Sequence, residues 1–116
     1  VEPDATPLRR FEVAWDRVVE SFDRLRPLWI TQFELLGQTD HLPEVREHLV
    51  QGLHAARDGL AELFAGIDPA EDPERARVVG SLYQAMLTGF LSQWLLDPST
   101  ALKGSEVVQA LRLVTA

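Results

Sequence analysis

Residues 72–98 constrain the fold more than any other part of the sequence, because they predict one long helix with a defined start and end. Asp72 is a favourable N-cap, since its carboxylate can accept hydrogen bonds from free backbone N–H groups of the first turn. Pro73 suits the first helical position, and Glu74 places negative charge at the positive end of the helix dipole. Pro98 ends the helix, because it disfavours the α conformation at the preceding residue. The expected helix has about 25 residues and is roughly 37 Å long.

Opposite faces of this helix carry side chains of different size. At about 100° per residue, one face presents large and mostly aromatic side chains, namely Val79, Tyr83, Met86, Phe90 and Trp94. The other face presents mostly small ones, Ser81, Ala85, Thr88 and Ser92, with Val78 and Leu95 beside them. A helix that is apolar or small nearly all round is buried on two sides. We therefore expect the large face to pack into its own domain and the small face to pack against a partner, for which a second copy of the chain is the simplest candidate.

The chain before this helix also predicts helices. Thr6 can cap a helix that begins at Pro7, in which apolar residues recur at steps of three and four, as Leu8, Phe11, Trp15, Val18, Phe22 and Leu25. Pro27 predicts a kink, after which a second, shorter helix continues to about Gln38.

A third helix is expected from Pro43 to about Ala65, with Gly66 as its C-cap. Gly52 and Gly59 lie inside it and cost about 1 kcal/mol each relative to alanine. We expect them to allow the close approach of another backbone.

Ser105 can cap a last helix, and no part of the sequence shows the alternation that predicts a strand. We therefore expect an all-α bundle of about five helices, forming a single domain over residues 1–116.

Composition excludes several classes of protein. The net charge is −7 at pH 7, and the 116 residues include no cysteine. An acidic surface repels phosphate, so this chain by itself is a poor candidate for binding DNA or RNA. Disulfides and thiolate metal sites are excluded, which fits a cytoplasmic protein. No apolar run approaches the length of about 18 residues that predicts a transmembrane helix.

The histidines do not predict a metal site. His41, Glu44 and His48 are spaced at i, i+3 and i+7, but Pro43 starts the helix and leaves His41 outside it. His54 lies off that face. A zinc site needs three or four convergent ligands, so solvated surface histidines are the better interpretation. Because no Ser/His/Asp order, P-loop or G-x-G-x-x-G is present, we expect neither an enzyme nor a cofactor.

Three stretches resemble the C-terminal, effector-binding and dimerisation domain of TetR-type transcriptional regulators. Residues 82–98 resemble the family's penultimate helix and read L-Y-Q-A-M-L-T-G-F-L-S-Q-W-L-L-D-P. Residues 43–60, P-E-V-R-E-H-L-V-Q-G-L-H-A-A-R-D-G-L, and residues 22–29, F-D-R-L-R-P-L-W, are similar to actinobacterial-type members. Many members carry an acidic residue before the glycine of the penultimate helix, where this chain has Thr88 before Gly89.

The resemblance implies the sensor domain of a transcriptional repressor. The family's signature is an N-terminal helix-turn-helix domain, and no short basic three-helix segment precedes Leu8. We therefore expect this chain to be a fragment, in which DNA is bound only through an N-terminal domain absent from it. The alternative is a relative of the family that acts independently of DNA.

The resemblance and the helix faces together give two candidate sites. Aromatic stripes at helical spacing usually form core, but a pocket between the helices of a bundle is also a common place for a ligand. The residues expected to line a pocket for a small hydrophobic effector are Trp15, Phe22, Trp29, Phe33, Tyr83, Met86 and Phe90. Tyr83, Gln32 and Thr88 are expected to supply its polar contacts.

The family dimerises by pairing the last two helices of each copy as a four-helix bundle. This implies a homodimer interface made of Ser81, Ala85, Thr88, Ser92, Leu95, Val107, Leu111 and Val114. Three other interpretations remain open. The small face can pack on the last helix of the same chain, the domain can be a helical protein–protein interaction module without a ligand, or it can be a small enzyme or metal carrier built around His41, Glu44 and His48.

Overall fold

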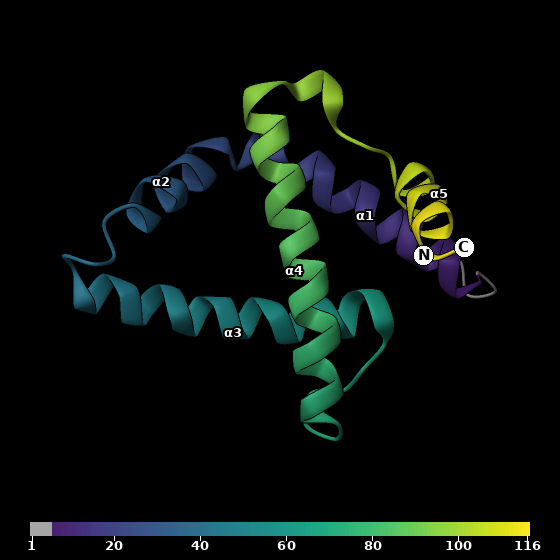
Figure 1. Ribbon diagram of the computed structural model, residues 1–116, viewed down its shortest axis with the longest axis horizontal. Coiled ribbons are helices and arrows are strands. Elements are labelled where there is room, and N and C mark those ends of the chain that lie inside the picture. Colours follow the sequence, from purple (N-terminus) through teal and green to yellow (C-terminus); the bar gives the residue numbers. More distant parts are fainter. Residues whose placement is uncertain (1–5) are drawn as a thin grey trace.

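The computed structural model describes residues 6–116, and this part of the chain contains helices joined by short connections and no strand (Figure 1). Its helices are α1 (Pro7–Arg24), α2 (Arg26–Leu36), α3 (Pro43–Ala65), α4 (Pro73–Leu96) and α5 (Gly104–Thr115), with the short 3-10 helix η1 (Pro98–Thr100) between the last two. The all-α prediction is therefore confirmed. Within residues 6–116, none of the helices combines the length and the apolar composition that crossing a membrane requires.

Local capping chemistry sets most of the helix boundaries. Thr6 Oγ1 accepts a hydrogen bond from the Arg9 amide at 3.2 Å, and Asp72 Oδ1 accepts one from the Arg75 amide at 3.3 Å. Gly66 ends α3 in the left-handed region at φ 66°, where glycine carries no steric penalty. These caps confirm the predicted starts of α1 and α4 and the predicted end of α3.

The start of α5 differs from the prediction. The N-cap is Lys103 rather than Ser105, and the Lys103 amide donates to Glu106 Oε1 at 3.0 Å. The Gly104 amide donates to Asp16 Oδ1 at 2.7 Å. A carboxylate on α1 thus accepts from the first N–H group of α5, so the helix begins before the serine that was expected to cap it.

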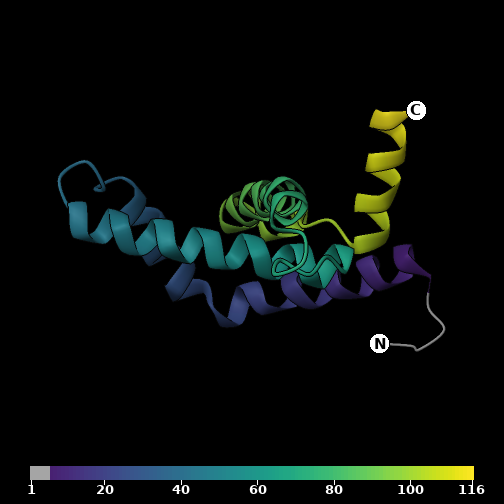
Figure 2. The ribbon, with the colours of Figure 1, turned by 90° about the horizontal axis from the view of Figure 1, so that it is seen from below.

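The helices form a layer with one helix laid across it. In Figure 1, α1, α2 and α3 follow the sides of a triangle, and α4 runs over it. Figure 2 shows α4 nearly end-on above the layer, while α5 stands away from it. The radius of gyration is 15.3 Å, whereas a compact domain of this length has about 13 Å. Helix α2 and the first part of α3 contain no buried residue, so this part of the fold is loosely packed.

Three apolar clusters hold this arrangement together. The first cluster contains Phe11, Ala14, Trp15, Phe64, Val107 and Val108, and so joins α1, α3 and α5. The second cluster contains Phe22, Leu91 and Trp94 and joins α1 to the end of α4. The third cluster contains Ala61, Ile67 and Ala76 and closes the connection between α3 and α4. Small side chains in the third cluster allow these two helices to approach closely.

Close backbone contact occurs at glycines other than those predicted. Nothing lies within 4 Å of the position that a Cβ would occupy at Gly52 or Gly59. The prediction that another backbone approaches closely at these two glycines was therefore wrong. A Cβ at Gly80 of α4 would overlap the Arg57 carbonyl oxygen of α3, and one at Gly104 would overlap the Glu12 carbonyl oxygen of α1. These two glycines mark where α4 crosses α3 and where α5 meets α1.

We expect Gly80→Ala to destabilise the fold by about 1–3 kcal/mol, because the added methyl group forces α4 away from α3. The matched control is Gly59→Ala, which meets open space inside a helix and should stabilise the fold by up to about 1 kcal/mol. Urea unfolding followed by circular dichroism measures both changes. Equal stability of the two variants would contradict the close contact at Gly80.

Candidate functional site

The seven residues predicted to line an effector pocket fall into two groups in the structure. Trp15 belongs to the first cluster, and Tyr83, Met86 and Phe90 pack against it. Phe22 belongs to the second cluster, and Trp29 and Phe33 pack against it. The two clusters are continuous, because Val18, Val19 and Leu87 contact both. The predicted residues therefore line one aromatic interior rather than one compact site.

Aromatic rings stack edge to face in the second cluster. The rings of Phe22 and Trp29 have centroids 6.5 Å apart at 81°, and those of Phe22 and Trp94 lie 5.8 Å apart at 60°. The Arg26 guanidinium lies 5.4 Å from the centre of the Trp94 ring, a cation–π arrangement. The cluster thus has a cation at its edge and aromatic faces inside.

Trp29 carries an unsatisfied donor. Its Nε1 atom is buried, and no acceptor lies within hydrogen-bond distance of it in residues 6–116. Trp15 differs, because its Nε1 donates to the Leu102 carbonyl at 3.2 Å. A buried donor without a partner costs about 1–3 kcal/mol, and such groups in native proteins are usually paired with protein, water or a ligand. The Trp29 N–H therefore marks a place in the aromatic interior where an acceptor atom would be favourable.

The polar residues predicted to orient an effector do not come together. Gln32 and Thr88 are exposed on α2 and α4, whereas Tyr83 is half-buried against the first cluster. Tyr83 instead lines a hollow of about 270 Å³ at the junction of four helices. The residues that line this hollow are Pro7, Leu8, Phe11, Phe64, Tyr83, Val108, Leu111, Arg112 and Thr115.

Sequence reasoning missed this hollow because its walls are distant along the chain. They come from α1, α3, α4 and α5, and no local pattern brings these residues together. A second hollow, of about 310 Å³, lies between α1 and Leu63 of α3, and Arg17, Val18 and Ser21 are among its lining residues.

Most of the predicted dimer residues are accessible in a single chain. Ser81, Ala85 and Thr88 are exposed, while Ser92 and Leu95 are half-buried. Leu111 and Val114 of α5 are also exposed. Val107 differs, because it is 2% exposed and belongs to the first cluster. Its side chain packs against the rest of its own chain and offers no surface to a second copy.

The accessible face of α4 is more apolar than the small-residue face identified from the sequence. Val78 is 55% exposed and Leu82 is 58% exposed. The Ser81 hydroxyl donates to the Arg77 carbonyl at 2.6 Å, and the Ser92 hydroxyl donates to the Gly89 carbonyl at 2.9 Å. Because these hydroxyl protons are used within the helix, the two serines add little polarity to the face.

We name this face the α4 stripe and define it by residues that recur at steps of four and three: Val78, Leu82, Ala85, Gly89, Ser92 and Leu96. No Asp, Glu, Lys or Arg occurs anywhere in residues 78–96. An uncharged stripe of this length on an accessible helix face is typical of a surface that packs against another helix.

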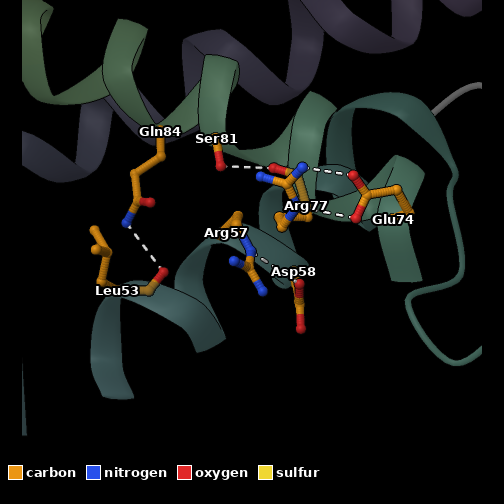
Figure 3. A network of polar contacts seen from close by, with 7 residues as sticks. All are labelled: Leu53, Arg57, Asp58, Glu74, Arg77, Ser81 and Gln84. Carbon is orange, nitrogen blue, oxygen red and sulfur yellow. Dashed lines mark hydrogen bonds and ion pairs between the residues drawn. The ribbon is translucent and has the colours of Figure 1, made fainter. Parts of the chain in front are cut away.

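Figure 3 shows the polar contacts near the crossing of α3 and α4, of which one joins the two helices. Gln84 Nε2 donates to the Leu53 carbonyl at 3.3 Å. At the start of α4, Arg77 Nε donates to Glu74 Oε2 at 3.0 Å, and the hydrogen bond from Arg77 lowers the pKa of Glu74. This ion pair is exposed and therefore contributes little to stability.

The structure gives no arrangement that would bind a metal among residues 6–116. His41, Glu44 and His48 are exposed, and no group of three His, Cys, Asp or Glu side chains in this part of the chain could hold an ion.

Comparison with models of protein families, with curated protein sequences and with solved structures returned no match.

Tyr83 gives a pH-dependent test of the first cluster. Burial raises the pKa of Tyr83 above its ordinary value of 10.0, so the folded state holds the phenolic proton more tightly than the unfolded chain does. This contribution to stability is fully present below pH 10 and is lost as the pH rises through the folded-state pKa. Because Tyr83 is the one tyrosine of the chain, ultraviolet absorbance reports its ionisation directly.

We expect the Tyr83 absorbance to titrate at higher pH in the folded protein than in urea. The Tyr83→Phe variant should lose less stability than the parent chain when the pH is raised above 10.0, as urea midpoints on either side of that pH would show. Identical titration of the folded and unfolded chains would contradict the partial desolvation of the hydroxyl.

Proposed function

We propose that this chain is the effector-binding and dimerisation domain of a TetR-like transcriptional repressor that acts in the cytoplasm. The sequence resemblance of residues 22–29, 43–60 and 82–98 to that family supports the proposal. The order and length of the helices are compatible with it. DNA binding in this proposal belongs to an N-terminal domain outside the chain.

The single observation that carries the proposal is the exposed α4 stripe. A helix at the centre of a domain normally turns charged residues to solvent, but α4 has none between residues 78 and 96. Contact with a second copy would remove this apolar surface from water. A twofold interface must be self-complementary, and the α4 stripe meets that condition.

The residue sizes along the stripe match an antiparallel pairing of two α4 helices. When the midpoints of the helices coincide, Val78 faces Leu96 of the other copy, Leu82 faces Ser92, and Ala85 faces Gly89. The small pair at the centre lets the two backbones approach, while the larger pairs fill the space towards both ends. This register is possible because the spacings between consecutive residues of the α4 stripe alternate between four and three, and their order is the same from either end of the helix.

Charges at the helix ends favour the same orientation. Arg75 lies in the first turn of α4 and is exposed, and Asp97 follows the last turn. Antiparallel pairing brings the arginine of one copy towards the aspartate of the other, and it also opposes the two helix dipoles. Parallel pairing would instead place the two Asp97 carboxylates side by side, whereas the first turn of α4 carries both signs of charge, on Glu74 and Arg75.

The effector is proposed to bind in the aromatic interior beside Trp29. A hydrophobic ligand with one acceptor atom would satisfy the buried Trp29 N–H and contact the rings of Phe22 and Phe33. Because α4 contributes both to this interior and to the α4 stripe, a shift of α4 on binding would change the dimer geometry. Two sites coupled through one element are what an allosteric repressor requires.

One observation favours a second candidate, a helical protein–protein interaction module without a ligand. Neither of the two hollows described above is lined by Phe22, Trp29 or Phe33. In this alternative the aromatic interior is simply core, and the α4 stripe binds its partner without control by an effector.

The dimer is tested by adding a charge to the centre of the α4 stripe. We expect the parent chain to have the mass of two 13.0 kDa chains in native mass spectrometry at micromolar concentration. Ala85→Arg should shift it to the monomer, because the twofold axis places the two new charges close together.

The control is Gln51→Arg, which makes the same change of charge at an exposed position of α3. It should leave the mass unchanged. A monomeric parent chain, or a dimer that survives Ala85→Arg, would place any assembly away from this stripe and would favour the interaction module.

The effector site is tested by tryptophan fluorescence. In a screen of hydrophobic compounds, we expect a ligand that quenches or shifts the emission of the parent chain to lose this effect in Trp29→Phe. The effect should persist in Trp15→Phe, because the Trp15 N–H is already bonded to Leu102. Circular dichroism verifies that each variant is folded. A response that survives in Trp29→Phe would remove the proposed role of that residue.

A further inference from the structure

We infer that the hollow between α1, α3, α4 and α5 is a binding site for a small organic carboxylate with a single aromatic or branched apolar body. It is distinct from the aromatic interior around Trp29, because none of its lining residues belongs to the second cluster. It goes beyond the proposed function and does not depend on it, since it rests on the geometry of the hollow alone.

Aromatic and aliphatic side chains form the floor of the hollow. The ring centroids of Phe11 and Phe64 lie 5.1 Å apart, and those of Phe11 and Tyr83 lie 5.7 Å apart. Phe64 and Tyr83 complete the triangle at 5.2 Å. Phe11 and Phe64 are themselves buried, so the accessible apolar surface of the hollow comes mainly from Leu8 and Leu111, which are 48% and 37% exposed. This surface matches the body of a ligand with a ring or a branched chain.

Arg112 is the one charged residue among the nine that line the hollow. Its guanidinium makes no ion pair within 4.0 Å to any acid of the described chain, where ion pairs involve other arginines. The net charge of the chain is −7, but the residues of the described chain that line the hollow include no acid. Guanidinium groups bind carboxylates through two parallel N–H donors, which gives the charged end of the ligand its partner.

Tyr83 adds a polar group to the same hollow. In residues 6–116 its hydroxyl makes no hydrogen bond to protein, and it is not among the fully buried polar atoms that lack a partner. The hydroxyl is therefore only partly shielded from solvent, and Tyr83 is one of the residues that line the hollow. Thr115, at the rim, uses its hydroxyl proton on the Leu111 carbonyl at 2.6 Å, so its oxygen is left as an acceptor.

The size of the hollow limits the ligand. Its volume of about 270 Å³ lies just below the range that begins at about 300 Å³ for drug-sized ligands. One ring with a short acidic side chain fits this volume. The combination of a triangle of rings, one cation and this volume selects an aryl or branched alkyl monocarboxylate.

The experiment compares phenylacetate with its uncharged analogue phenylacetamide, using amide chemical shifts in NMR titrations of the whole chain. We expect phenylacetate to bind up to about fivefold more tightly than the amide, because an ion pair to an exposed arginine is worth up to about 1 kcal/mol. The shifts should cluster at Phe11, Tyr83 and Leu111. Arg112→Gln should abolish the preference for the acid while leaving the affinity for the amide unchanged.

Arg46→Gln is the matched control, because Arg46 is also exposed but lies near the start of α3, outside the hollow. It should retain the preference for the acid. The measured quantity must be the affinity for the ligand rather than the stability of the protein. Arg112 lies in the last turn of α5, where a cation stabilises the helix through its dipole whether or not a ligand binds. Equal affinity for acid and amide, an Arg112→Gln variant that still prefers the acid, or no saturable shift up to about 10 mM phenylacetate would overturn the proposal. None of these results would alter the expected mass of the dimer or the response of Trp29.

Discussion

The buried indole of Trp15 is the contact on which the helical arrangement depends. The side chain is 0% exposed, and its ring lies 6.1 Å from that of Phe64 on α3 and 5.2 Å from that of Phe90 on α4. Its N–H donates to the Leu102 carbonyl, in the segment that leads into α5. A buried tryptophan needs a partner for its one donor, and here that need fixes the path of the chain between α4 and α5. One side chain on α1 thus positions three other parts of the fold.

Helix boundaries could be read from the sequence where the capping groups are local. Thr6, Asp72 and Gly66 act within a few residues of the ends that they define, so the order of residues is sufficient. The start of α5 could not be predicted in this way, because the acceptor is Asp16 on another helix. The prediction of close backbone contacts at Gly52 and Gly59 was wrong for the same reason. Gly52 and Gly80 both lie inside helices, and the sequence does not distinguish them. Only Gly80 lies where α4 crosses α3, so only Gly80 contacts the backbone of another helix.

The candidate sites show the same limit. Periodicity identified the aromatic residues of the interior and the small residues of α4, but it could not divide the rings between two clusters. The family resemblance implied that Val107 lies at the dimer interface, whereas packing of α5 against α1 buries it. The hollow beside Arg112 depends on four helices meeting, and no single stretch of sequence carries that information. What the sequence does carry is the absence of charge along α4, which becomes informative once the structure shows which face is accessible.

The division of the fold into a well-packed and a sparsely packed half has a consequence for its energetics. Helix α2 has no buried residue, and the buried residues of α3 all lie near its end. The rings of Trp29 and Phe33 are the main apolar attachment of α2 to the remaining helices. Such segments open at a free-energy cost well below that of global unfolding. The triangle of helices can therefore part along one side while Trp15 keeps the other side closed, so that solvent and small molecules gain access to the aromatic interior without loss of the fold.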